Sequence, residues 1–154
     1  MIIIIIGQSG AGKSTAVKSN YLEPNMELKK QPIKHTTNEE TCLIGDYKTD
    51  RRCVGTDTIP YDALQDIINF IKQNKDQYER IVAEGDRINN KKFFKNLLKL
   101  QEPLKIIIFK CSLEKSKKRL PNQNPSFIKT TKTKTENIAK YLEKNGIPYD
   151  EVET

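Results

Sequence analysis

The sequence opens with MIIIIIGQSGAGKST (residues 1–15), an apolar run that leads directly into a glycine-rich loop. Five consecutive isoleucines predict a strand that is buried on both faces, like the central strands of a parallel sheet. Glycines at positions 7, 10 and 12 let backbone N–H groups turn toward one point without Cβ clashes. Residues 13–20 predict a helix, whose N-terminus adds a partial positive charge at that point. This stretch therefore predicts an α/β fold with an anion-binding loop between its first strand and first helix.

The loop also fits a specific phosphate-binding pattern. Gly7 to Ser14 match G-x-x-x-x-G-K-[ST] in full, with the preceding strand and following helix that the pattern requires. In such loops the lysine contacts the β- and γ-phosphates of a nucleotide, and the hydroxyl of the last residue ligates magnesium. We therefore expect ATP and Mg²⁺ as cofactors, with Ser14 as the metal ligand. The expected ATP-binding residues are Gly7, Gly10, Ala11, Gly12, Lys13, Ser14 and Thr15, and Lys13 is also an expected catalytic residue.

The rest of the chain predicts a single domain, residues 1–154. Its hydrophobic content of 36% and charged content of 31% are typical of a soluble globular protein with one core. Strand-like and helix-like segments alternate, which predicts a P-loop NTPase-like three-layer α/β fold with a mostly parallel central sheet flanked by helices. The longest apolar run, Ile2 to Ile6, is too short to cross a bilayer, so we expect a cytoplasmic protein. Its three cysteines are expected to be reduced there.

Local patterns suggest where the remaining elements lie. Apolar residues at three- and four-residue spacing predict an amphipathic helix with Tyr61 on its apolar face. Residues 37–57 and 121–132 predict polar connections. The spacing of Thr133 and Glu136 is that of a capping box, which predicts that the last helix begins there.

Acidic residues and an arginine follow the predicted strand 80–84. Parallel α/β sheets bind ligands at the carboxyl ends of their strands, which is where Glu84, Asp86 and Arg87 lie. A carboxylate there can hold the water shell of magnesium or orient an attacking hydroxyl, and Arg87 can grip an acceptor phosphate. We predict catalytic roles for Glu84 and Asp86, and substrate binding by Arg87. In the structural alternative, Glu84 caps the next helix and Arg87 pairs with it.

A second candidate acceptor element precedes the amphipathic helix. Arg51 and Arg52 are adjacent in a polar segment, and two neighbouring guanidinium groups repel each other unless an anion is bound. We predict that Arg51, Arg52 and Asp57 bind the substrate. Asp57 is also a catalytic candidate, since either Asp57 or Asp46 could deprotonate an acceptor hydroxyl. Asp57 could equally serve only to favour the dipole of the following helix. Tyr47 and Tyr61, which flank the arginine pair, could stack on a base, although its place on the amphipathic helix favours a core position for Tyr61.

Positive charge is concentrated in the second half of the chain. Residues 91–144 contain fourteen lysines and Arg119 against four glutamates, a net charge of +11. Such a region can attract a polyanion, so nucleic acid is one expected partner. Equally, these lysines could lie on solvent-exposed helix faces without binding a partner. Arg119 is predicted to be catalytic, because a cation after the third apolar strand can neutralise charge on the triphosphate.

Taken together, these motifs resemble the small P-loop kinases of the nucleoside monophosphate kinase superfamily. Within it, the chain is similar to a phage group that includes the 5-hydroxymethyluracil DNA kinases. The resemblance implies a kinase that uses ATP and magnesium to phosphorylate the hydroxymethyl group of 5-hydroxymethyluracil in DNA, in the cytoplasm of a phage-infected host cell. One departure is that the arginine-rich lid of nucleotide kinases is mostly lysine here. The resemblance rests on residues 7–15, 43–47, 51–52, 55–57, 84–87, 112–120 and 134–138.

Two other functions remain open on the sequence. The chain could be a free (deoxy)nucleoside monophosphate kinase, in which Arg51, Arg52 and Arg87 grip the substrate phosphate. It could also be a non-enzymatic P-loop module that binds or senses nucleotide.

Overall fold

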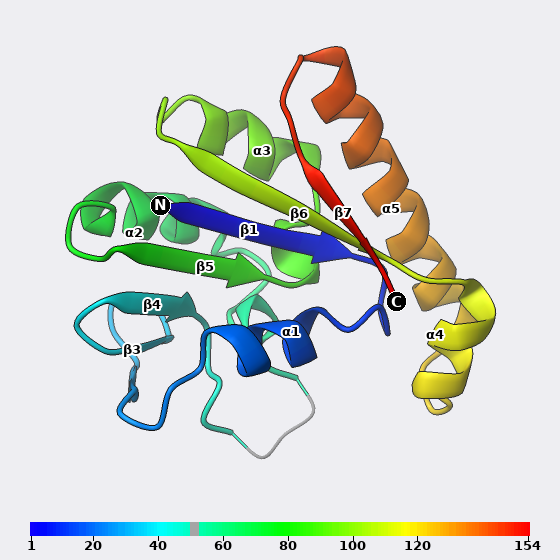
Figure 1. The fold of residues 1–154 in the computed structure, drawn as a ribbon, viewed down its shortest axis with the longest axis horizontal. Helices are drawn as coiled ribbons and strands as arrows, with labels where there is room; N and C mark the ends of the chain where they lie inside the picture. Colours follow the sequence, from blue (N-terminus) through cyan, green and yellow to red (C-terminus); the bar gives the residue numbers. More distant parts are fainter. Residues whose placement is uncertain (50–52) are drawn as a thin grey trace.

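The computed structural model describes residues 1–49 and 53–154, which form a seven-stranded sheet with helices on both faces (Figure 1). The strand order is β2-β3-β4-β5-β1-β6-β7. The five strands from β4 to β7 in this order are parallel, and β2 and β3 add an antiparallel edge. The strands are β1 (Ile2–Gly7), β2 (Glu27–Lys29), β3 (His35–Thr37), β4 (Thr41–Ile44), β5 (Arg80–Glu84), β6 (Leu104–Lys110) and β7 (Asp150–Glu153).

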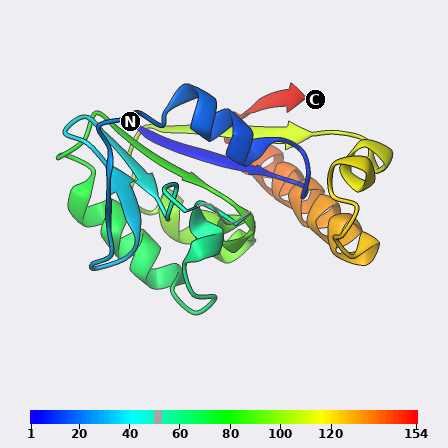
Figure 2. The same cartoon turned by 90° about the horizontal axis from the view of Figure 1, so that it is seen from below.

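Helices form the outer layers, as the view in Figure 2 shows. α1 (Lys13–Asn20) covers one face of the sheet, and α2 (Leu64–Asn74), α3 (Lys91–Leu98) and α5 (Pro125–Lys144) cover the other. Alternate isoleucines of β1 belong to the two different cores, Ile3 and Ile5 to the α1 side and Ile2, Ile4 and Ile6 to the opposite side. The apolar run of β1 is thus explained by burial on both faces, and the predicted three-layer fold is confirmed.

The order of the strands fixes where a ligand can bind. After β1 the chain continues to strands on the far side of β5, and after β5 it continues to β6, on the far side of β1. The connections after β1 and β5 therefore run in opposite directions, which opens a crevice at the carboxyl ends of these two neighbouring strands. The pairing of Ile5 with Glu84 places the glycine-rich loop beside the end of β5. Two short 3-10 helices also begin there, η1 (Thr56–Thr58) and η2 (Asp86–Ile88).

Three local predictions were wrong. The segment 37–57 contains β4, a short strand whose four residues are all buried, because it pairs with β5 in the sheet interior. The last helix begins at Pro125, where the Asn124 side chain accepts a hydrogen bond from the Ser126 N–H, and not at the capping-box spacing further on. Tyr61 precedes α2 and is 76% exposed, so it is not part of the core.

The cysteines and the helix lengths can also be compared with the expectations from the sequence. Cys42, Cys53 and Cys111 are free thiols, as expected. Within the described stretches, every helix is too short or too polar to span a bilayer.

Candidate functional site

The glycine-rich loop joins β1 to α1 at the crevice. Gly12 precedes the helix with a φ of 92°, a left-handed conformation that suits glycine. Among the described residues no side chain caps this helix, so its first N–H groups can bind a ligand. The Lys13 Nζ donates to the carbonyl oxygens of Gly7 and Gln8, both at 3.0 Å. The lysine therefore folds back over the loop, with its ammonium group beside the backbone that would hold phosphate.

Lys13 lies in a buried and acidic environment. Burial lowers the pKa of the ammonium group, and the nearby carboxyl groups of Glu84, Asp57 and Asp86 counteract part of that effect. All three acidic residues singled out in the sequence as catalytic therefore act electrostatically on the loop lysine. The tertiary structure brings together groups that lie more than forty residues apart in the chain.

Glu84 ends β5 beside the loop and is only 1% exposed. Its Oε1 accepts hydrogen bonds from the Ser14 hydroxyl at 3.0 Å and from the Tyr47 hydroxyl at 2.7 Å. Burial raises the pKa of Glu84, while Lys13 and these two hydrogen bonds oppose the rise. Glu84 therefore binds the side chain expected to ligate magnesium; it neither caps the next helix nor pairs with Arg87. Tyr47 is 4% exposed, so the expectation that it stacks on a base was wrong.

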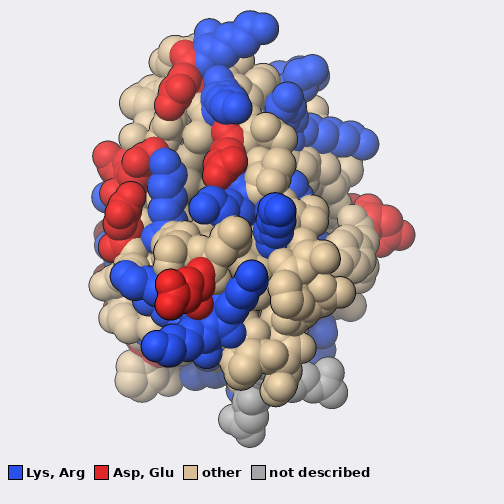
Figure 3. Space-filling model, turned by 90° about the vertical axis from the view of Figure 1, so that its right-hand side faces the viewer, with Lys and Arg blue, Asp and Glu red and all other residues tan. Residues whose placement is uncertain are grey.

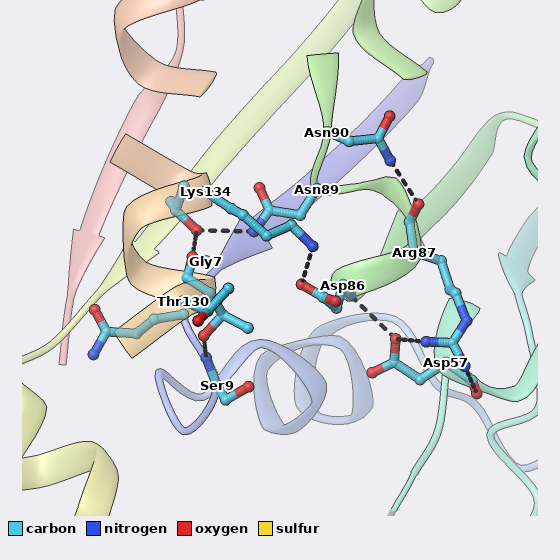
Figure 4. A network of polar contacts seen from close by, with 12 residues as sticks. Gly7, Ser9, Asp57, Asp86, Arg87, Asn89, Asn90, Thr130 and Lys134 are labelled. Carbon is cyan, nitrogen blue, oxygen red and sulfur yellow. Dashed lines mark hydrogen bonds and ion pairs between the residues drawn. The ribbon is translucent and has the colours of Figure 1, made fainter. Parts of the chain in front are cut away.

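Asp57 and Asp86 come together from η1 and η2. The Asp86 N–H donates to Asp57 Oδ1 at 3.1 Å, and the Arg87 Nη1 lies 3.9 Å from the same oxygen (Figure 4). Arg87 is also fixed by its Nε, which donates to the Ile59 carbonyl oxygen at 3.1 Å. Burial raises the pKa of Asp57, whereas the hydrogen bond from Asp86 and the charge of Arg87 lower it. Asp57 is thus held in place at the site rather than at the start of α2.

The last helix supplies two contacts that the sequence did not suggest. The Lys134 Nζ lies 2.9 Å from Asp86 Oδ1, and Figure 4 shows the lysine reaching across from α5. The Ser9 N–H of the loop donates to the Thr131 hydroxyl at 3.0 Å. These pairs are 48 and 122 residues apart in the chain, so no local pattern could have predicted them.

The loop and the acidic residues line one cavity of about 300 Å³. Two exposed aromatic side chains also line it: Tyr61, and Phe127 at the start of α5. The Arg87 guanidinium lies over the Tyr61 ring, 3.5 Å from its centroid, which fixes that ring at the cavity wall. The described residues lining the cavity are Ser9, Gly10, Lys13, Ser14, Cys53, Val54, Asp57, Tyr61, Glu84, Asp86, Arg87, Leu120, Gln123 and Phe127.

The sequence also singled out three arginines besides Arg87. The Arg119 Nη1 donates to the Gly10 carbonyl oxygen and to the Thr154 hydroxyl, both at 2.9 Å, and Arg119 is not among the described residues that line the cavity. Arg119 therefore braces the backbone of the loop from α4 (Leu113–Arg119). Arg51 and Arg52, predicted to bind the acceptor, lie outside the described residues.

The lysine-rich region 91–144 spans α3, β6, α4 and α5. Figure 3 shows the side of the molecule where α4 and α5 lie, with lysine and arginine side chains in several groups. Acidic and uncharged side chains separate these groups. The positive charge on this side is therefore mixed with negative charge and does not form an unbroken stripe.

The site has oxygen donors that suit magnesium. Ser14 Oγ and Glu84 Oε1 lie 3.0 Å apart beside the loop. Across residues 1–49 and 53–154, His, Cys, Asp and Glu side chains nowhere gather in a group of three or more that could hold a metal by themselves. Magnesium commonly takes only one or two protein oxygens and completes its shell with water and substrate phosphates. The donor set here fits that mode of binding.

Comparisons with known proteins leave the family of the chain open. No family model matches it, and no curated protein matches it. Among solved structures, it is similar to the deoxyadenosine kinase from M. mycoides with the products dCMP and a flexible dCDP bound, at a TM-score of 0.46 and 14% sequence identity. That similarity covers 99% of this chain and 89% of the other. A likeness at this level does not indicate what the chain binds, so its function has to be inferred from the cavity residues.

Proposed function

We propose that this protein is an ATP- and magnesium-dependent kinase whose acceptor is a small nucleotide-class molecule, a free (deoxy)nucleoside or its monophosphate. The observation that carries the proposal is the shared cavity, in which Lys13 and Ser14 of the phosphate loop face Asp57, Glu84 and Asp86. A nucleotide-binding loop alone needs no such set of acids. Carboxylates beside the terminal phosphate of ATP supply what a transfer reaction needs on the acceptor side.

Each residue has a role that follows from its contacts. The loop N–H groups and Lys13 bind the phosphates of ATP, and Glu84 orients the Ser14 hydroxyl through their hydrogen bond. Ser14 and Glu84 would hold magnesium, which would supply positive charge beside the phosphates of ATP. Arg87 and Asp86 hold Asp57 in place through the contacts at its Oδ1.

The transfer step requires one proton acceptor. The acceptor oxygen forms a bond to the γ-phosphorus as the bond from that phosphorus to the β,γ-bridging oxygen breaks, and ADP leaves. When the acceptor is a hydroxyl group, its proton passes to the Asp57 carboxylate. Asp57 suits this role because burial raises its pKa, which makes the carboxylate a stronger base than an exposed aspartate.

The walls of the cavity favour a planar acceptor. Tyr61 is 76% exposed and Phe127 is 37% exposed. Both rings line the same cavity, whose volume of about 300 Å³ is at the small end of typical ligand sites, roughly 300–1,000 Å³. Exposed aromatic rings at such a site are suited to stacking on a nucleobase.

The proposal is tested by an acceptor screen. The protein is incubated with ATP and magnesium and with each nucleoside and nucleoside monophosphate in turn, and the products are identified by mass spectrometry. We expect one or a few acceptors to gain a single phosphate, and Lys13→Ala to abolish that gain while circular dichroism shows an intact fold. ATP binding without transfer to any acceptor would indicate instead a non-enzymatic module.

A second candidate acceptor is the hydroxymethyl group of 5-hydroxymethyluracil in DNA, as the sequence resemblance implies. The net charge of +11 on residues 91–144 favours it, because a polyanion is attracted to such a region. In that case the protein acts in the cytoplasm of a phage-infected host cell. Salt separates the two acceptors: affinity for DNA falls steeply from about 50 to 200 mM salt, whereas affinity for a small acceptor changes little.

A further inference from the structure

A second cavity adjoins the one at the phosphate loop. Its volume is about 530 Å³, and Asp57 and Cys53 line both cavities. Asp57 therefore forms part of the boundary between them. An acceptor whose reacting group lies at Asp57 can extend into the second cavity as well as toward Tyr61.

Two lysines from the β2–β3 hairpin line this second cavity, Lys30 just after β2 and Lys34 just before β3. Both are exposed, and neither ammonium group forms an ion pair with any residue in the stretches 1–49 and 53–154. Asp46 also lines the cavity; its Oδ1 accepts a hydrogen bond from the Lys48 N–H at 2.8 Å, and among the described residues its carboxylate forms no ion pair with either lysine. Two lysines that form no ion pair with the described residues thus line a hollow that Asp57, the candidate base, also lines.

The side of the sheet to which Lys29 and Lys30 point follows from the alternation of side chains along β2. Side chains alternate between the two sides of a strand. Leu28 and Lys30 line the second cavity, whereas Glu27 and Lys29 line a different hollow on the other side of β2. Lys30 and Lys29 are neighbours of equal charge that face opposite ways. Any effect that depends on the second cavity must therefore distinguish between them.

We propose that Lys30 and Lys34 bind a phosphate group of the acceptor, so that the acceptor is a nucleotide rather than a bare nucleoside. This inference rests on the proposed function, because it assumes that a hydroxyl group of the acceptor reacts at Asp57 while its phosphate lies in the second cavity. The phosphate is the shared chemistry of a free nucleoside monophosphate and of a nucleic-acid backbone. Lysine ammonium groups bind either one as point charges, and a cavity open to both lysines lets them bind the same group.

A strand-edge position explains why lysines can serve here. β2 is the edge strand of the sheet, and charged side chains are common on such edges because they discourage pairing with other chains. That role accounts for Lys29 as well as for Lys30. It does not account for two lysines in one hollow that shares Asp57 with the phosphate-loop cavity.

The experiment compares three kinds of acceptor on three proteins. The acceptors are a deoxynucleoside, its 5′-monophosphate and a short oligonucleotide of the same base, and they are tried with each of the four ordinary bases and with 5-hydroxymethyluracil. The proteins are the wild type, the double variant K30Q/K34Q and the matched control K29Q. Steady-state kcat/KM is measured for each acceptor at saturating ATP and magnesium, and KM for ATP is measured separately.

We expect K30Q/K34Q to lower kcat/KM for a phosphorylated acceptor by about tenfold or more, through KM, since two charge-assisted contacts are lost. KM for ATP and kcat/KM for the nucleoside should stay within about twofold of the wild type, and K29Q should behave like the wild type. A loss confined to the monophosphate identifies a free nucleotide as the acceptor. A loss confined to the oligonucleotide identifies a nucleic-acid backbone.

Two results would overturn the inference while leaving the kinase assignment intact. One is a wild-type enzyme that phosphorylates the nucleoside as efficiently as the phosphorylated acceptors. The other is a K30Q/K34Q variant that matches K29Q on every acceptor. If the wild type phosphorylates none of the three kinds of acceptor, the proposed function itself fails, and the inference fails with it.

Discussion

The hydrogen bond from Tyr47 to Glu84 offers the sharpest test of how the site is held together. Tyr47→Phe removes one oxygen atom and keeps the ring, which is 4% exposed and packs in the core on the α1 side of the sheet. The deleted hydroxyl donates to Glu84 Oε1 at 2.7 Å, and Glu84 is 1% exposed. The variant therefore leaves a buried carboxylate with one fewer donor, and the Ser14 hydroxyl remains bonded to the same oxygen.

The expected magnitude follows from the charge of the acceptor group. A hydrogen bond to an ionised group contributes about 1.5–3 kcal/mol to stability, and a bond between neutral groups about 0.5–1.5 kcal/mol. A domain of this size loses roughly 2–4 °C of Tm per kcal/mol, so Tyr47→Phe should lower Tm by about 3–12 °C at neutral pH. Burial also raises the pKa of Tyr47, so the hydroxyl remains a proton donor throughout the neutral range.

The loss should depend on pH with a definite sign. Burial raises the pKa of Glu84, and the Tyr47 hydrogen bond opposes that rise, so the bond favours the ionised form. Its full contribution is present above the folded-state pKa of Glu84. As pH falls through that pKa, Glu84 becomes protonated and the difference between variant and wild type should shrink to the value for a neutral pair.

Urea unfolding of both proteins from about pH 4.5 to 8 measures this difference. Tyr21→Phe is the matched control, because the Tyr21 hydroxyl has no hydrogen-bond partner among the described residues; we expect a change within about 0.5 kcal/mol there. A Tyr47→Phe difference that is below about 0.5 kcal/mol at pH 8, or one that grows as pH falls, would refute the reasoning.

Three further predictions concern the site. Asp57→Asn should lower kcat by about 10²–10⁴-fold and remove the acidic limb of the plot of kcat against pH. In the wild type that limb should lie above the usual aspartate range, because burial raises the pKa of Asp57. An unchanged limb would mean that another residue is the base. Glu84→Gln keeps an acceptor oxygen for Ser14 but removes a buried charge, so the variant should have an equal or higher Tm than the wild type. Its kinase activity should nevertheless fall by at least about tenfold. A clear drop in Tm would contradict this prediction. Gly10→Ala should destabilise the protein and raise KM for ATP, because Gly10 has a φ of 84° and the new Cβ would lie 3.1 Å from the Cα of Ser116. Gly146→Ala is the control: Gly146 has a φ of 66° and nothing within 4 Å of the new Cβ. That variant should show only the backbone strain of about 1–2 kcal/mol and no change in KM.

Much of the fold could be read from local patterns. The bounds of α1 and of the strand ending at Glu84 were predicted from apolar runs and glycine punctuation, since these elements are specified by neighbouring residues. β4 was missed because a four-residue strand in the sheet interior carries no periodic signal of its own. The start of α5 was missed because Thr133 and Glu136 match a capping box by chance, whereas Asn124 provides the actual cap.

The candidate site also combines residues that the sequence predicted with contacts that only the fold creates. The sequence by itself determined the phosphate loop, because Gly7 to Ser14 are contiguous and their role depends on backbone conformation and on the helix that follows. It also pointed to Glu84, as an acid at a strand end. Only the tertiary structure decided that Glu84 is held by Tyr47 and Ser14, at separations of 37 and 70 residues. Side chains so distant in the chain meet only because the sheet aligns the carboxyl ends of its parallel strands, and no local pattern encodes that alignment.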